Sequence, residues 1–235
     1  MRLNKYIAAC GVCSRREADK LIQEGKVTVN GQIPEMGLDI SDADTVCVDG
    51  KKIGLNKEHV VLAYYKPAGV VCTEKDEHAE RTVIDDLGYE KRVTYAGRLD
   101  KDSEGLLIMT DDGELIQAMM KGSNMHEKQY EVTVDKKIDD TFINRMSSGV
   151  YLKELDVTTR KCKVKKTSDS SFEIILTQGL NRQIRRMCAE LGYEVWSLKR
   201  VRVMTVSLFE LDLKPSEYVE ITGDEKDKLY RACGL

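Results

Sequence analysis

The pattern of apolar positions at the start of the chain predicts two short helices. Leu3, Ile7 and Ala8 recur at the spacing of one helix face. A second helix is expected to follow Ser14, a good N-cap residue, with Glu17 three positions later completing a capping box. The sequence therefore opens with a helix–turn–helix arrangement.

The residues after these helices change to the alternating pattern of strands. Residues 26–29 and 45–48 alternate apolar with polar side chains, and they are followed by Asn30-Gly31 and Asp49-Gly50, both strong tight-turn signals. We expect residues 1–55 to form one small helix–helix–hairpin domain. The polar residues 56–60 would then be a linker.

The longer remainder, residues 61–235, alternates strands with helices. Strands are expected at residues 60–65, 69–73, 106–110, 129–134, 161–166, 171–177 and 201–208. Helices are expected at residues 114–121, 139–147 and 182–191. Because strands outnumber helices and tight turns join many of them, the fold class is α+β, with a mostly antiparallel mixed sheet flanked by helices.

The charge distribution adds a possible partner. The net charge is −3, but residues 1–32 carry six Lys or Arg against three acids, and residues 178–204 carry six against two. Two basic segments in a chain that is acidic overall are compatible with binding RNA over a limited surface. No run of 18 apolar residues suggests a membrane span, and the N-terminus lacks the apolar core of a secretory signal. We expect a cytoplasmic protein without membrane contact.

The seven cysteines fit reduced thiols in that compartment. Cys10 and Cys13 form a C-x-x-C pair, but a zinc site would need a second pair of ligands at short spacing. The three histidines are scattered along the chain. We therefore expect both cysteines to pack inside the helical module, and no metal site.

Three stretches could carry chemistry. Residues 96–110 place a glycine, an arginine and an aspartate just before a buried strand, and residues 179–188 crowd arginines into the first turn of a helix. Such arginines oppose the helix dipole unless an anion is near. Residues 127–132 hold a tyrosine in an alternating strand. Local pattern alone favours a surface ion pair for the first and an ordinary strand tyrosine for the third, and it leaves the second open.

In combination these stretches resemble the RsuA family of bacterial ribosomal RNA pseudouridine synthases. The matching motifs are Lys66-Pro67-Ala-Gly69, Gly97-Arg-Leu-Asp100 with Ser103-x-Gly105-Leu-Leu107, Lys128-x-Tyr130 and Gly179-x-Asn-Arg-Gln-Ile-Arg-Arg-Met187. The N-terminal residues look like an S4 RNA-binding domain, which precedes the catalytic domain in that family. Residues 126–135 and 161–166 are similar to the F-type members that act on 23S ribosomal RNA.

The resemblance implies roles for individual residues. Asp100 would be the catalytic aspartate, acting on the ribosyl C1′ or abstracting a sugar proton. Arg185 would pair with it and keep it ionised, and Tyr130 would contact the uracil. The expected substrate-binding residues are Arg98, Asn181, Arg182 and Ile184, with Arg98 holding the RNA open and Ile184 packing near the base. The expected RNA-binding residues of the S4-like domain are Arg2, Lys5, Ser14, Arg15, Arg16 and Lys20.

The implied reaction breaks an N-glycosidic bond, rotates uracil and forms a C–C bond at C5. Such chemistry needs no cofactor, and the chain has no G-x-x-x-x-G-K-[ST] phosphate loop. The partner would be ribosomal RNA, 23S or a large-subunit assembly intermediate, and the protein a monomer. Three alternatives stay open: a non-catalytic S4-type assembly factor, a relative acting on 16S RNA, and a glycoside hydrolase using Asp100 and Asp102.

Overall fold

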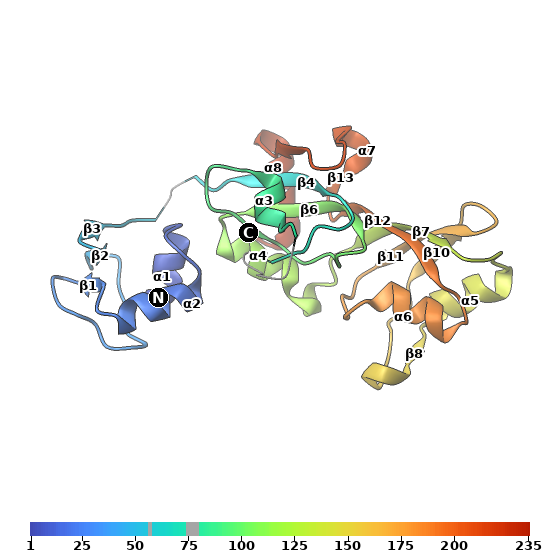
Figure 1. Cartoon of the computed structure of the whole chain (residues 1–235), viewed down its shortest axis with the longest axis horizontal. Coiled ribbons are helices and arrows are strands. Elements are labelled where there is room, and N and C mark those ends of the chain that lie inside the picture. Colours follow the sequence, from blue (N-terminus) through green and yellow to red (C-terminus); the bar gives the residue numbers. More distant parts are fainter. Residues whose placement is uncertain (56–57, 74–79) are drawn as a thin grey trace. The chain divides into compact units, whose positions relative to one another are not determined.

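The computed structural model describes residues 1–55, 58–73 and 80–235 (Figure 1). The chain divides into two compact units. The first contains Met1–Val60 and two short later segments, Tyr89–Val93 and Asp111–Gly113. The second contains Val61–Gly88, Thr94–Thr110 and Glu114–Leu235. Part of the expected linker, residues 56–57, lies outside the described residues.

The first unit has the elements that the sequence predicts. Its helices are α1 (Leu3–Ala9) and α2 (Arg15–Gln23). Its strands β1 (Val27–Val29), β2 (Val46–Val48) and β3 (Lys51–Lys52) form an antiparallel sheet in that order. The Ser14 hydroxyl accepts the Glu17 N–H at 3.2 Å while the Glu17 carboxylate accepts the Ser14 N–H at 3.0 Å, so the predicted capping box is confirmed.

The second unit is built on a nine-stranded sheet with the order β10-β11-β7-β12-β6-β4-β14, to which β5 and β13 add on β6 and β12. Its strands are β4 (Val61–Lys66), β5 (Thr94–Tyr95), β6 (Glu104–Thr110), β7 (Lys128–Val134), β10 (Lys163–Lys166), β11 (Ser171–Leu176), β12 (Val195–Val203), β13 (Val206–Ser207) and β14 (Tyr218–Glu220). The pairing of β12 with β6 is parallel and the other pairings are antiparallel. The predicted mostly antiparallel mixed sheet is therefore confirmed.

Helices and short elements complete this unit. The α-helices are α3 (Val83–Leu87), α4 (Gly113–Met120), α5 (Asp140–Ser148), α6 (Gln183–Glu190), α7 (Leu208–Leu211) and α8 (Gly223–Cys233). The 3-10 turns are η1 (Gly122–Asn124) and η2 (Lys153–Leu155), and β8 (Tyr151–Leu152) pairs with β9 (Val157–Thr158).

Two apolar clusters flank the middle of the sheet. One joins β4 and β6 to α4 and α8 and includes Val203 at the end of β12. The other joins β7 and β11 to α5 and α6 and includes Val195 and Leu198 at the start of β12. Because β12 belongs to both clusters and pairs in parallel with β6, the junction of β12 and β6 links the two halves of the sheet.

Two strand predictions are wrong in part. Residues 69–73 do not resume β4: after Pro67 only an isolated bridge forms there, between Val71 and Thr82. The proline cannot donate to a ladder, and Gly69, with φ of 91°, turns the chain away. The strand expected at residues 201–208 begins earlier, at Val195, because its first half also pairs with β7, and it ends at Val203, before β13.

Candidate active site

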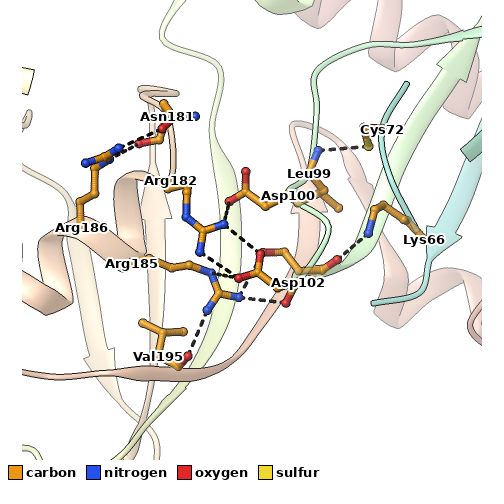
Figure 2. Close-up of polar contacts among 11 residues, drawn as sticks. Lys66, Cys72, Leu99, Asp100, Asp102, Asn181, Arg182, Arg185, Arg186 and Val195 are labelled. Carbon is orange, nitrogen blue, oxygen red and sulfur yellow. Dashed lines mark hydrogen bonds and ion pairs between the residues drawn. The ribbon is translucent and has the colours of Figure 1, made fainter. Parts of the chain in front are cut away.

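The loop before β6 and the start of α6 bring together two aspartates and two arginines (Figure 2). The Arg182 guanidinium donates to both carboxylate oxygens of Asp102, at 3.1 and 2.9 Å, and its Nη1 lies 3.7 Å from the Asp100 carboxylate. The Arg185 Nε lies 3.3 Å from the Asp102 carboxylate. Residues about 80 positions apart thus form one charged cluster, and the Asp102 carboxylate is an anion near the arginine-rich start of α6.

The pairing within the cluster differs from the expected one. Arg185 contacts Asp102, and the guanidinium that reaches Asp100 is that of Arg182. Arg185 lies three residues further along the helix, and its two terminal nitrogens donate to the backbone oxygens of Asp102 at 2.9 Å and Val195 at 3.0 Å. The predicted direct pair of Arg185 with Asp100 is therefore wrong. Arg185 instead bridges the β6 loop and β12.

Asp102 is the member of the cluster that sequence reasoning missed as a site residue of the synthase. The hydrogen bonds from Arg182 lower its pKa, and the positive charge of Arg185 adds to that effect. Bidentate pairing with arginine is the strongest geometry for a carboxylate–cation pair. Asp102 therefore stays ionised and holds Arg182 beside Asp100. Its only signal in the sequence was its place two residues after Asp100, in the same turn.

Two buried basic side chains, Lys66 and Arg200, donate hydrogen bonds to the backbone around the Asp100 loop. The fully buried Lys66 donates its Nζ to the backbone oxygen of Ser103 at 2.7 Å, and burial lowers the pKa of its ammonium group. The Arg200 side chain, 2% exposed, donates to the backbone oxygens of Leu106 at 2.7 Å and Arg98 at 3.4 Å. The loop that carries Asp100 is thus fixed on both sides of that residue.

Gly105 explains why this junction can form. Its φ is +111°, and a Cβ there would collide with the backbone of Arg200 on the paired strand. Only glycine lets β6 and β12 approach at this point. The glycine of the motif thus has a packing reason independent of any substrate.

Tyr130 comes to the same junction from β7. It is half-buried and lies opposite Arg200 in the β7–β12 register, and it packs against the second apolar cluster. Its neighbour Lys128 is also half-buried, and burial first, then the charge of Arg200, lowers the pKa of its ammonium group. The Lys-x-Tyr motif therefore lines the sheet beside the charged loop.

The other predicted substrate-binding residues have different surroundings. Arg98 is exposed, and its side chain has no hydrogen bond or ion pair with the described residues. Ile184 is 3% exposed and packs in the core, so its side chain is largely unavailable to a bound base. Asn181 accepts from Arg186 through its side chain at 3.2 Å and its backbone at 3.0 Å (Figure 2). Arg186 also forms an ion pair with Glu154, so it points away from the aspartates.

Only some of the expected RNA-binding residues of the first unit have side chains that are available to bind RNA. Arg15, Arg16 and Lys20 are exposed on α2. Arg2 instead bonds to the Gly37 backbone and lies 3.7 Å from Asp39, and the Ser14 hydroxyl serves as the helix cap. Lys5 is half-buried and has an interaction of its own. Three of the six residues therefore present an open cationic surface.

The chemistry available is that of a carboxylate among arginines. The Asp100 side chain is 32% exposed, which leaves it open to a substrate, and the Arg182 guanidinium lies 3.7 Å from its carboxylate. The described residues contain no group of three or more His, Cys, Asp or Glu placed to hold a metal. Within the described part of the chain, no helix is both long and apolar enough to cross a membrane.

Comparisons with known proteins identify the family of the chain. The family model described as RNA pseudouridylate synthase matches residues 60–190, and the S4 domain model matches residues 1–33. The solved structure titled "Crystal structure of pseudouridylate synthase" superposes with a TM-score of 0.72 at 28% sequence identity, covering 97% of this chain and 99% of that one.

Curated relatives extend the match over nearly the whole chain. The dual-specificity RNA pseudouridine synthase RluF of Escherichia coli K12 is 45% identical over 98% of this chain and 79% of its own length. The ribosomal large subunit pseudouridine synthase B of Bacillus subtilis 168 is 36% identical over 97% of this chain and 95% of its own length. The chain therefore belongs to the RNA pseudouridylate synthase family, as an enzyme with an N-terminal S4 domain.

Proposed function

We propose that this enzyme isomerises a uridine of ribosomal RNA, in the 23S molecule or a large-subunit assembly intermediate, with Asp100 as the catalytic group. The observation that carries the proposal is the position of Asp100: a partly exposed carboxylate with the Arg182 guanidinium 3.7 Å away. The names of the relatives supply the RNA class, since one of them is a ribosomal large subunit synthase.

The site geometry supports a division of roles. An ionised carboxylate can act on the ribosyl C1′ or remove a sugar proton, and either route breaks the glycosidic bond between C1′ and N1 of uracil. The base must then rotate so that C5 bonds to C1′, and the C5 proton is lost to solvent. Asp102 and Arg185 fix Arg182, and Arg182 stabilises the charge on Asp100.

Access to Asp100 requires the uridine to leave its stack, which costs roughly a few kcal/mol. Tyr130, half-buried beside the loop, offers a ring for the extruded base. Arg98 is exposed, and its side chain, which has no hydrogen bond or ion pair with the described residues, can fill the gap left in the RNA. The exposed basic residues of the S4 domain would hold phosphates further along the molecule. The enzyme would work as a cytoplasmic monomer and would need no cofactor.

The test is tritium release from RNA labelled at C5 of uridine. Wild-type protein should release tritium without strand cleavage or loss of base, because the new C5–C1′ bond replaces the C1′–N1 bond and displaces only the hydrogen at C5. The Asp100→Asn variant should release none above background while it still binds RNA, since asparagine keeps the shape but not the charge. Activity within about tenfold of wild type, a barrier change of only about 1.4 kcal/mol, would remove Asp100 from its role.

A further inference from the structure

Trp196 is the only tryptophan of the chain, and 68% of it is exposed. It lies in β12 at an irregularity: Val195 pairs with Val134 of β7 and Ser197 with Thr133, which leaves Trp196 between them without a partner. Bulges of this kind re-aim a side chain and are frequent beside active sites. A large aromatic side chain held in solvent at such a point has no role in the described core.

The position of Trp196 connects it to the charged cluster. The backbone oxygen of Val195, the preceding residue, accepts from Arg185 at 3.0 Å, and the same guanidinium donates to the backbone of Asp102 at 2.9 Å. Figure 2 shows Val195 at the end of the contacts that run from Asp100 through Arg182, Asp102 and Arg185. Trp196 thus directly follows Val195, the residue whose backbone oxygen binds Arg185 of the cluster beside Asp100.

We propose that Trp196 stacks on an unpaired base next to the target uridine. The inference rests on the proposed RNA substrate. When a nucleotide is extruded, its neighbours lose a stacking partner. Exposed aromatic rings bind such bases through their faces, and they do so without reading the sequence. Trp196 would therefore contribute affinity for the opened RNA, and the target would be a loop or bulge where a flanking base is free.

Other exposed aromatic residues lack this combination. Phe209 is 65% exposed on α7, and among the described residues it has no hydrogen bond with the charged cluster; its backbone N–H donates to the Ser207 hydroxyl. Tyr151 is 51% exposed, but its hydroxyl donates to Asp156 on the small β8–β9 hairpin. Phe209 is therefore a matched control of similar exposure in the same unit.

The first experiment uses Trp196 as its own reporter. Unmodified ribosomal RNA transcribed in vitro is titrated into the full-length Asp100→Asn protein, so that no turnover occurs, and tryptophan emission is followed. Stacking should quench emission with the same midpoint as filter binding. Fully paired duplex RNA should quench it much less, because its bases are already stacked.

The second experiment compares variants. Trp196→Ala should raise the Kd for the RNA about tenfold, the lower part of the range for losing one base–aromatic stack. It should raise KM more than it lowers kcat in the tritium assay, and Trp196→Phe should restore most of the affinity. Phe209→Ala should bind RNA like wild type. If Trp196→Ala does not fold, the emission titration still decides, because it needs no change at this position.

Three results would overturn the inference. The first is unchanged emission while filter binding reports saturation. The second is equal affinity of Trp196→Ala and Phe209→Ala. The third is quenching by intact ribosomal subunits but not by their RNA, which would assign Trp196 to a protein contact. Tritium release by wild type together with any of these leaves the proposed function standing, whereas absence of tritium release is a failure of that function itself.

Discussion

The two basic regions of the molecule use the same side chains in opposite ways. On α2 of the first unit, Arg15, Arg16 and Lys20 are exposed and open to solvent. At α6, Arg182 and Arg185 are tied to carboxylate and backbone oxygens. An open cation can bind any phosphate, whereas a cation with fixed partners presents its charge at one point. The first region is suited to holding RNA and the second to orienting a reacting group.

Among the variants that test this contrast between the two basic regions, the largest effect is expected at Arg182, the cation next to Asp100. Arg182→Met should lower kcat by about 100-fold or more, since removing one charge-stabilising donor in other enzymes costs about 10²–10³. Arg182→Lys should recover little, because lysine cannot form the forked pair with Asp102. Single-turnover tritium release measures the chemical step, and filter binding should show a much smaller loss of affinity.

Arg186 provides the control on the same helix. It bonds to Asn181 and Glu154 and points away from the aspartates, so Arg186→Met should leave the chemical step within about threefold, under 1 kcal/mol. Equal losses in Arg182→Met and Arg186→Met would mean that α6 acts only as a basic surface. The distinction between the two regions would then disappear.

Asp102 should show a smaller effect that depends on pH. Its pKa is lowered in the folded protein, so its ion pair contributes stability above the unfolded pKa, which is about 3.9 for a model aspartate. This contribution is lost as the pH falls through the folded value. Asp102→Asn should therefore unfold more readily than wild type at neutral pH, and the difference should shrink below about pH 4. Because the side chain is 46% exposed, the difference should be modest. Urea unfolding at several pH values measures it, and a difference that grows on acidification would contradict the assignment.

The sequence predicts features that depend on residues close together in the chain better than features that depend on distant residues. The capping box at Ser14 and the turn at Asn30, with φ of 53°, depend on residues a few positions apart, and both were predictable. Helix α8 carries a comparable local signal, with Asp224 and Glu225 in its first turn, but it is not among the helices expected from the sequence.

The site required contacts that no local pattern contains. Motif resemblance identified Asp100 and the arginine-rich helix, yet it predicted Arg185 as the partner where the structure has Arg182. Whether Arg182 or Arg185 reaches Asp100 depends on the positions of the backbone oxygens of Asp102, before β6, and Val195, at the start of β12. Arg185 donates to these two oxygens and is therefore held away from Asp100. Pairing between strands distant in sequence sets that geometry, and spacing along α6 cannot reveal it.

The open cations of α2 should affect binding without affecting chemistry. Replacing Arg15 and Arg16 together with glutamine should lower the slope of log Kd against log salt by about 1.4–1.8, or about 0.7–0.9 for each phosphate contact. The rate of tritium release at saturating enzyme should not change. Replacing the exposed Lys51 and Lys52 of β3 removes the same charge from the same unit and should alter the slope less. Equal slopes for the two double variants would show that net charge alone matters.

The smallest effect is expected at Ser14, where the resemblance implied RNA contact and the structure shows a helix cap. Ser14→Ala removes the acceptor for the Glu17 N–H and should destabilise α2 by about 1 kcal/mol. Hydrogen exchange should show it as faster exchange of the Glu17 amide, by about fivefold for 1 kcal/mol, with the amides of α6 unchanged. Ser14→Asp is the informative partner, because aspartate caps a helix as well as serine but brings a negative charge towards any phosphate. If Ser14 acts as a cap alone, the aspartate variant keeps both the slow exchange and the affinity for RNA. If Ser14 also contacts RNA, the aspartate variant keeps the slow exchange of the Glu17 amide but binds RNA more weakly. The RNA-binding surface of α2 would then include its N-cap residue.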